Sequence, residues 1–236
     1  VLQDLGEYHA ALKAHLKRVA RPDTEIVMHG MHPGTYRSDY PGEDIRHAGL
    51  QHLHSLQFLA AGVRAEEEGF DAYAISTLPD PGLREIRSLL RIPTVGYGES
   101  AMLTSCLLGS RFSILVFINE LTDLLTDNAR RYGFGERLVG VSDVGFRFAD
   151  VQAGYADPAP LIERFRTSAR AQIAAGAEVI IAGEAPLCVL LATHSISNVD
   201  GVPVLDSLSC WVKQAELLVE LKRVSGIERC QRGYFH

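Results

Sequence analysis

The chain has 236 residues, 47% of them hydrophobic and 22% charged, which is the composition of an ordinary globular protein with enough apolar surface to bury a core. Its formal net charge of −6 gives no electrostatic reason to expect nucleic acid or an anionic membrane as a partner. No apolar stretch approaches the roughly 20 residues that span a bilayer, no signal peptide is expected, and the four cysteines form no C-x-x-C pair, so a cytoplasmic protein is favoured.

Short β-branched runs alternate with longer helical patterns along the whole chain. Strands that are nearly continuously apolar and alternate with helices are typical of an α/β fold, in which helices cover both faces of parallel sheets. In chain order the patterns predict a helix over 3–20, a strand over 25–29, a helix over 43–68, a strand over 72–76, a helix over 81–90, a strand over 94–97, a helix over 100–108, a strand over 112–117, a helix over 120–132, a strand over 137–141, a helix over 158–175, a strand over 179–182, a helix over 185–193, a strand over 202–205 and a helix over 207–224.

Two of these helices have a recognisable start. Asp80-Pro81 and Asp157-Pro158 each place an acidic residue before a proline. Aspartate is a favoured N-cap and proline is favoured at the first helical position. We therefore expect Asp80 and Asp157 to cap the helices that follow them.

An internal repeat divides the chain into two similar halves. Residues 69–78 align with 176–185 without a gap, and residues 92–96 align with 202–206. We expect two pseudo-symmetric lobes, 1–109 and 110–236, with the last helix returning to the first lobe. The second lobe opens with a strand at Phe112 whereas the first opens with a helix, so we expect the opening strand of the first lobe to lie upstream of Val1.

The repeat selects one polar residue at the tip of a strand in each lobe. Thr77 and Glu184 occupy equivalent positions, directly after their apolar strands. Ligands bind beyond the carboxyl ends of the strands in open parallel sheets. Two lobes that face each other would place these side chains on opposite walls of one cleft, which predicts the active site there. The alternative is that both residues are ordinary helix caps on loops.

Five ordered segments resemble motifs of a known family. Residues 71–83, DAYAISTLPDPGL, resemble the first active-site motif of hydantoin racemases, in which an apolar strand leads to Cys, two residues and Asp-Pro-Gly. Four more segments resemble later motifs of the same branch of the aspartate/glutamate/hydantoin racemase superfamily: 92–102, 111–115, 176–185 and 203–206. The resemblance implies a two-lobed α/β fold with the active site between the lobes. It also places Thr77 and Glu184 where the family carries its two catalytic cysteines.

Both replacements change the expected chemistry. The family's thiols act as alternating base and acid on the two faces of the α-carbon, whereas a threonine hydroxyl, with a pKa far above neutral pH, is no base at neutral pH. A partly buried carboxylate reaches a useful pKa of about 6–7. The sequence therefore favours a cofactor-independent hydrolase or lyase with Glu184 as general base, acting on a small carboxylate or a cyclic amide, imide, ureide or lactone. The alternatives are a racemase or isomerase acting at a carbon alpha to a carbonyl, and a non-catalytic small-molecule-binding relative.

Further residues near the strand ends are candidates for substrate binding: Ser76, Leu78, Gly183, Ala185, His29, Tyr97, Phe117 and His194. Tyr36 and Arg37 are candidates for a lid, and Glu99 is interpreted as a capping acid. For His194 the alternative to substrate binding is that it caps a helix. His47 and His54 share a helical face that His52 does not join, so no metal site is expected. The resemblance implies a small-molecule substrate and a homo-oligomer.

Overall fold

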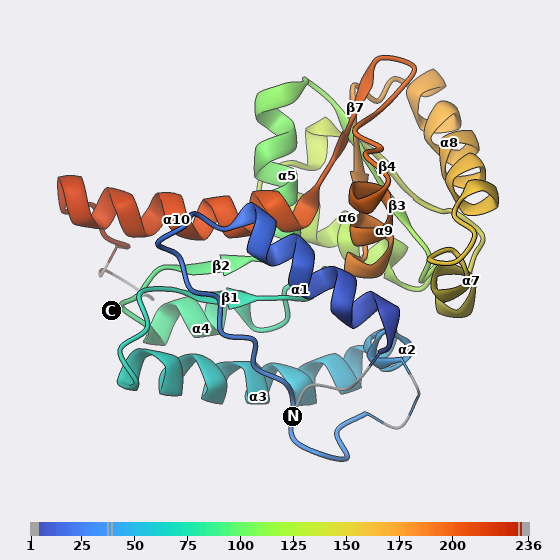
Figure 1. Cartoon of the computed structure of the whole chain (residues 1–236). Helices are drawn as coiled ribbons and strands as arrows, with labels where there is room; N and C mark the ends of the chain where they lie inside the picture. Colours follow the sequence, from blue (N-terminus) through green and yellow to red (C-terminus); the bar gives the residue numbers. More distant parts are fainter. Residues whose placement is uncertain (1–4, 37, 39, 231, 233–236) are drawn as a thin grey trace.

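The computed structural model describes residues 5–36, 38, 40–230 and 232, which form two β-sheets wrapped by helices (Figure 1). Every strand of the first sheet, and all but the short edge strand of the second, runs parallel to its neighbours. The central strands are buried along their whole length, as expected for sheets covered on both faces. The predicted α/β fold with parallel sheets flanked by helices is confirmed.

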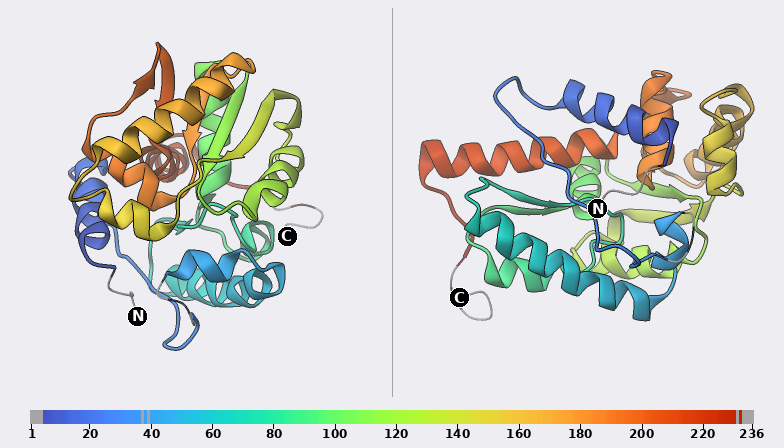
Figure 2. Two further views of the ribbon diagram at one scale, coloured as in Figure 1. Left: turned by 90° about the vertical axis from the view of Figure 1, so that its right-hand side faces the viewer. Right: turned by 60° about the horizontal axis from the view of Figure 1, so that its bottom comes forward.

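The first sheet consists of β1 (Tyr73–Ile75) and β2 (Thr94–Gly96). Helices α3 (Ala48–Glu67) and α4 (Leu83–Leu89) lie on one face, and the long α10 (Ser207–Ser225) crosses the other (Figures 1 and 2). A small apolar core lies between this sheet and its two helices, formed by Ile75, Leu83, Ile86 and Leu90.

The second sheet has the order β4-β3-β5-β7-β6 and carries most of the protein's core. Its strands are β3 (Phe112–Val116), β4 (Leu138–Asp143), β5 (Val179–Ala182), β6 (Asn198–Val199) and β7 (Val202–Leu205). The helices that belong to it or join it to the first sheet are α5 (Tyr97–Leu108), α6 (Leu121–Arg131), α7 (Phe148–Ala153), α8 (Ala159–Ala174) and α9 (Ala185–Thr193), and a 3-10 turn lies at Gly135–Arg137.

The two sheets are joined by helices that belong to both. Helix α1 (Glu7–Val19) packs against α9 and α10, and α10 packs against α5 as well as the first sheet. The main apolar core runs from the second sheet into these helices and reaches Leu78 and Val95 of the first. The position of one sheet relative to the other is therefore fixed by shared packing.

The internal repeat is visible in the backbone. Gly69 and Gly176, the first residues of the two aligned segments, both have positive φ, at 85° and 102°, and each follows a long helix. The pairing registers also correspond: Ala74 pairs with Val95 in the first sheet, and their aligned equivalents Ile181 and Leu205 pair in the second.

Several elements differ from prediction, and α7 and β6 were not predicted at all. Residues 25–29 form no strand, because an apolar run marks side chains that can be buried but a strand also needs a hydrogen-bonded neighbour. The helix predicted over 43–68 is divided, since α2 (Pro41–Ile45) is separated from α3 by the extended backbone of His47. The helix predicted from residue 81 begins at Leu83, because Gly82 just before it adopts a left-handed conformation, with φ at 72°.

Candidate functional site

Glu184 lies at the carboxyl edge of the second sheet, where β5 turns into α9. Its side chain is 3% exposed and reaches across to the end of the neighbouring β3. The Phe117 amide donates to both carboxyl oxygens at 3.0 and 3.1 Å, and the Ile118 amide donates to Oε1 at 3.0 Å. Two consecutive backbone donors therefore fix the carboxyl group at the tip of the sheet.

Burial dominates the electrostatics of this carboxyl group. Desolvation raises the pKa of Glu184 to about 8, and the nearby Asp143 adds to the rise, while the backbone donors act in the opposite direction. A group with this pKa exchanges protons near neutral pH, which is what a general base or acid requires.

Aromatic rings from distant parts of the chain enclose the same tip. Tyr40 stacks on Phe148, with ring centroids 3.8 Å apart and planes 7° apart, and lies 6.0 Å from Phe117. Burial, followed by the neighbouring Tyr8 and Glu184, holds the pKa of Tyr40 well above its usual range. Tyr40, just ahead of α2, therefore belongs to the aromatic surroundings of the Glu184 carboxyl group.

The Thr77 loop of the first sheet adjoins the Glu184 turn of the second. Thr77 is half-buried and Ser76 exposed, while Leu78 is 4% exposed and belongs to the main core. A methyl group added at Gly183 would lie 3.0 Å from Leu78 Cδ2, so these two residues are in contact. The residues beside Thr77 and Glu184 thus meet between the sheets, and the catalytic roles of Thr77 and Glu184 stay predictions.

The other candidates occupy a range of positions. Ala185 is half-buried at the first turn of α9, and Tyr97 is 1% exposed with its hydroxyl group beside the Cys188 thiol. His29 is exposed on the segment that forms no strand. His194 is exposed at the C-cap of α9. The nine residues of this helix, each rising about 1.5 Å, separate it from Glu184 at the other end. Its position favours the helix-cap alternative.

The residues interpreted as a lid or as caps also have defined places. Tyr36 packs edge-on against the ring of His54, and Arg37 lies outside the described residues. Glu99 is paired with both terminal nitrogens of Arg87.

Asp80 does not cap the helix after it, because its carboxylate accepts hydrogen bonds from Gly98 and Glu99 at the start of α5. Asp157 makes no side-chain cap either, since Pro158 precedes α8 without one.

A second buried polar cluster lies behind α9. Asp206 at the end of β7 accepts from His15 Nε2 at 3.1 Å and from the Cys188 thiol at 3.4 Å. Arg18 lies 2.8 Å from the other nitrogen of His15. Hydrogen bonds from His15 and Ser209 overcome partial burial and lower the pKa of Asp206 to about 2. The sequence pattern did not single out this cluster, because its members are far apart in the chain.

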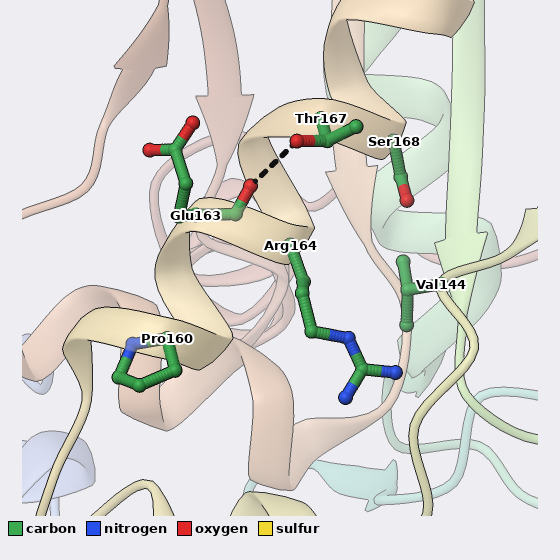
Figure 3. Close-up of a pocket in the computed structure, with 6 residues that line it drawn as sticks. All are labelled: Val144, Pro160, Glu163, Arg164, Thr167 and Ser168. Atoms are coloured by element: carbon green, nitrogen blue, oxygen red, sulfur yellow. Dashed lines mark hydrogen bonds between the residues drawn. The ribbon is translucent and has the colours of Figure 1, made fainter.

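Two cavities lie elsewhere in the described part of the chain, and neither is lined by Glu184 or Thr77. One, of about 380 Å³, lies along α8 and is lined by Val144, Pro160, Glu163, Arg164, Thr167 and Ser168 (Figure 3). Its Arg164 already donates to the Gly145 carbonyl and lies over the Phe146 ring. The other, of about 250 Å³, adjoins Asp206 and Cys188.

The described part of the chain contains no group of three His, Cys, Asp or Glu side chains placed to hold a metal ion. Within the same residues, no helix has the length and apolar character needed to cross a membrane.

Comparison with known proteins gives the family. The sequence model of the family described as Asp/Glu/Hydantoin racemase matches residues 7–215. The hydantoin racemase of Pseudomonas sp. (strain NS671) is 30% identical over 219 residues, which cover 92% of this chain and 80% of that protein. The hydantoin racemase of Paenarthrobacter aurescens is 31% identical over 162 residues, covering 67% of this chain and 66% of that protein.

Solved structures give the same fold. Allantoin racemase from Pseudomonas fluorescens has a TM-score of 0.79 at 24% identity, with 97% of this chain and 90% of that chain covered. Allantoin racemase from Klebsiella pneumoniae has a TM-score of 0.72 at 22% identity, with 97% and 87% covered. The family match spans both sheets and both motif positions, Thr77 and Glu184. The chain therefore belongs to the Asp/Glu/hydantoin racemase family.

Proposed function

We propose that the protein is a racemase that inverts the carbon beside a carbonyl group in a small, uncharged cyclic ureide of the hydantoin class. The family and the hydantoin racemase relatives support racemisation more strongly than the hydrolase or lyase activity that the two substitutions favoured from sequence alone. The observation that carries the proposal is the buried carboxyl group of Glu184, fixed by two backbone amides at the motif position of the family's second thiol.

In this mechanism Glu184 is the base on one face of the ring. Its carboxylate removes the proton from the carbon, and the electrons of the broken C–H bond move to the carbonyl oxygen to give a planar enolate. A water molecule held by the Thr77 hydroxyl protonates the opposite face and becomes hydroxide, and the proton that Glu184 removed passes to this hydroxide to restore water and the carboxylate. Thr77 thus orients the proton donor and needs no ionisation of its own.

The surroundings of Glu184 favour a neutral ligand. The adjacent side chains include the rings of Tyr40 and Phe117, and the amides of Phe117 and Ile118 are already bound to the carboxyl group. A second carboxylate beside Glu184 would be repelled and would lose hydration without a matching donor. A flat ureide ring, by contrast, can stack on the aromatic side chains.

The test uses single enantiomers of 5-substituted hydantoins in D2O. Chiral chromatography should show racemisation, and mass spectrometry should show one deuterium gained at the ring carbon without ring opening. Glu184→Gln should lower kcat by about 10²- to 10⁴-fold, the usual share of a general base, while Cys230→Ala, at an exposed thiol, should retain activity. Undiminished racemisation in the Gln variant would overturn the role of Glu184.

Hydrolysis of a cyclic amide is a second candidate, and one observation favours it. Of the two motif positions only Glu184 is ionisable near neutral pH, and hydrolysis needs one base to activate one water molecule. The same assay separates the two functions, because hydrolysis yields a ring-opened acid that is 18 Da heavier in ordinary water. Ring opening that depends on Glu184 would replace racemisation as the function.

A further inference from the structure

Asp80 lies three residues after Thr77 and connects the Thr77 loop to two other elements. Its side chain is buried, at 5% exposure, and its backbone has a left-handed conformation that is unusual for a non-glycine residue. The carboxylate accepts hydrogen bonds from the Gly98 amide at 3.0 Å, the Glu99 amide at 2.8 Å and the Tyr132 hydroxyl at 3.0 Å. It therefore caps the start of α5 and binds the C-terminal end of α6.

The glycine-rich turn before α5 is shaped to admit this carboxylate. A methyl group added at Gly96 would lie 2.7 Å from Asp80 Cγ and Oδ1. One added at Gly98 would lie 2.4 Å from the Leu78 carbonyl oxygen and 3.0 Å from Asp80 Oδ2. The distances of 2.7 Å at Gly96 and 2.4 Å at Gly98 are too short for a real side chain. The two glycines therefore allow the loop and the turn to pack closely together.

The loop is held on its other side as well. Asn128 of α6, which is 2% exposed, donates to the Pro79 carbonyl at 2.9 Å. The Asp80 amide donates to the Thr77 carbonyl at 3.0 Å, which closes a tight turn directly beside Thr77. Because α6 packs on β4, these bonds tie the Thr77 loop to the sheet that carries Glu184.

We propose that Asp80 is a positioning residue, whose carboxylate fixes the Thr77 loop against α5 and α6 and thereby sets the position of the Thr77 hydroxyl relative to the Glu184 carboxyl. The role in turnover rests on the proposed function, whereas the fixing of the loop does not. Three groups face the carboxylate: Tyr132 from the end of α6, Glu99 from α5, and Arg87 from α4. Arg87 pairs with Glu99 and also donates to the Thr94 carbonyl, so the charge of Glu99 is balanced.

The position of Asp80 gives the reaction a second pH dependence. Burial raises the pKa of Asp80 to about 7 in spite of its three donors. Protonation below that pH weakens the bonds to Gly98 and Glu99. Turnover limited by the placement of Thr77 should therefore rise with pH near 7, and this rise should be absent in Asp80→Asn, which cannot titrate.

The experiment compares Asp80→Asn with wild type and with Glu184→Gln by hydrogen–deuterium exchange and by kinetics. Asparagine tolerates the left-handed conformation, so the Asn variant should fold. Peptides that cover 76–80 and 97–100 should exchange about tenfold faster in Asp80→Asn, while the β5 peptide should be unchanged. kcat should fall about 10- to 100-fold with KM within about threefold, since a misplaced group affects the reacting step.

Two results would overturn the proposal, and each differs from failure of the proposed function. Exchange unchanged at 76–80 and 97–100 would show that Asp80 does not hold the loop, whether or not any hydantoin is turned over. Faster exchange with unchanged kcat and pH profile would remove its role in placing Thr77. Asp80→Gly gives a second check, because it relieves the backbone strain but also lacks the carboxylate, and it should reproduce the kinetic loss of the Asn variant.

Discussion

Leu78 packs directly against Gly183, and through this contact the turn that carries Thr77 meets the turn that carries Glu184. The space at Gly183 is limited on all sides, since an added methyl group would lie 2.8 Å from the Leu115 carbonyl, 3.0 Å from Leu78 Cδ2 and 3.1 Å from Val116 Cγ1. The Gly183 amide also donates to Leu115 at 2.9 Å. The contact explains why the residue before the family's second catalytic position is glycine here.

Gly183→Ala should therefore destabilise the protein and separate the two turns. Forcing a methyl group into this packed space should lower the free energy of unfolding by about 1–3 kcal/mol, and racemase activity should fall further than the loss of folded protein explains. Gly140→Ala is the matched control, because its nearest neighbour would lie at 3.6 Å. Urea denaturation of the two variants checks the prediction, and equal stabilities would contradict it.

The buried carboxyl groups make stability depend on pH. Burial raises the pKa of Glu184 to about 8 and that of Asp80 to about 7, whereas both titrate near 4 in the unfolded chain. The folded state therefore holds more protons between about pH 4 and 8, and the free energy of unfolding falls as the pH rises through this range. Denaturation at pH 5 and 8 should show a loss of about 6 kcal/mol in wild type and about half of that loss in Glu184→Gln. Equal losses would mean that Glu184 does not titrate in this range.

The sequence was sufficient for the architecture because apolar strands and helix periodicity are local signals. The strand 179–182 and the helix 185–193 have the predicted bounds, and the aligned segments of the repeat pair in matching registers in the two sheets. The strand predicted over 25–29 was wrong, because the apolar pattern of a segment carries no information about whether a neighbouring strand is present to pair with it.

The site was predictable only in part, for a similar reason. The repeat and the motif resemblance both select Thr77 and Glu184, and Leu78 and Gly183 beside them are in contact. Tyr40 was missed, because nothing local links it to Glu184. The proline after Asp80 led to its interpretation as the cap of the next helix. The amides that donate to its carboxylate instead belong to Gly98 and Glu99, 18 and 19 residues away.

His15 and Asp206 form a partly buried hydrogen-bonded pair, and the loss of this pair should appear in acid. The hydrogen bonds to Asp206 lower its pKa to about 2, so they add stability above about pH 4 that is lost as the pH falls toward 2. His15→Ala should lower the free energy of unfolding at pH 7 by about 1–3 kcal/mol and move acid unfolding to higher pH. Circular dichroism between pH 2 and 5 measures the shift. An unchanged acid midpoint would contradict the stabilising role of the pair.

Tyr40 belongs to the aromatic surroundings of Glu184, and its removal should change the pKa of the carboxyl group that the proposed mechanism uses. Tyr40→Ala deletes the ring stacked on Phe148 and admits water to the Glu184 tip, so the pKa of Glu184 should fall from about 8 toward its ordinary value. The rising limb of the pH–rate profile should then move to lower pH, and KM should increase because a wall of the binding site is lost. Tyr40→Phe is the control, since it keeps the stacked ring and should retain the wild-type profile. A profile that stays in place in Tyr40→Ala would mean that Tyr40 does not shield Glu184 from water.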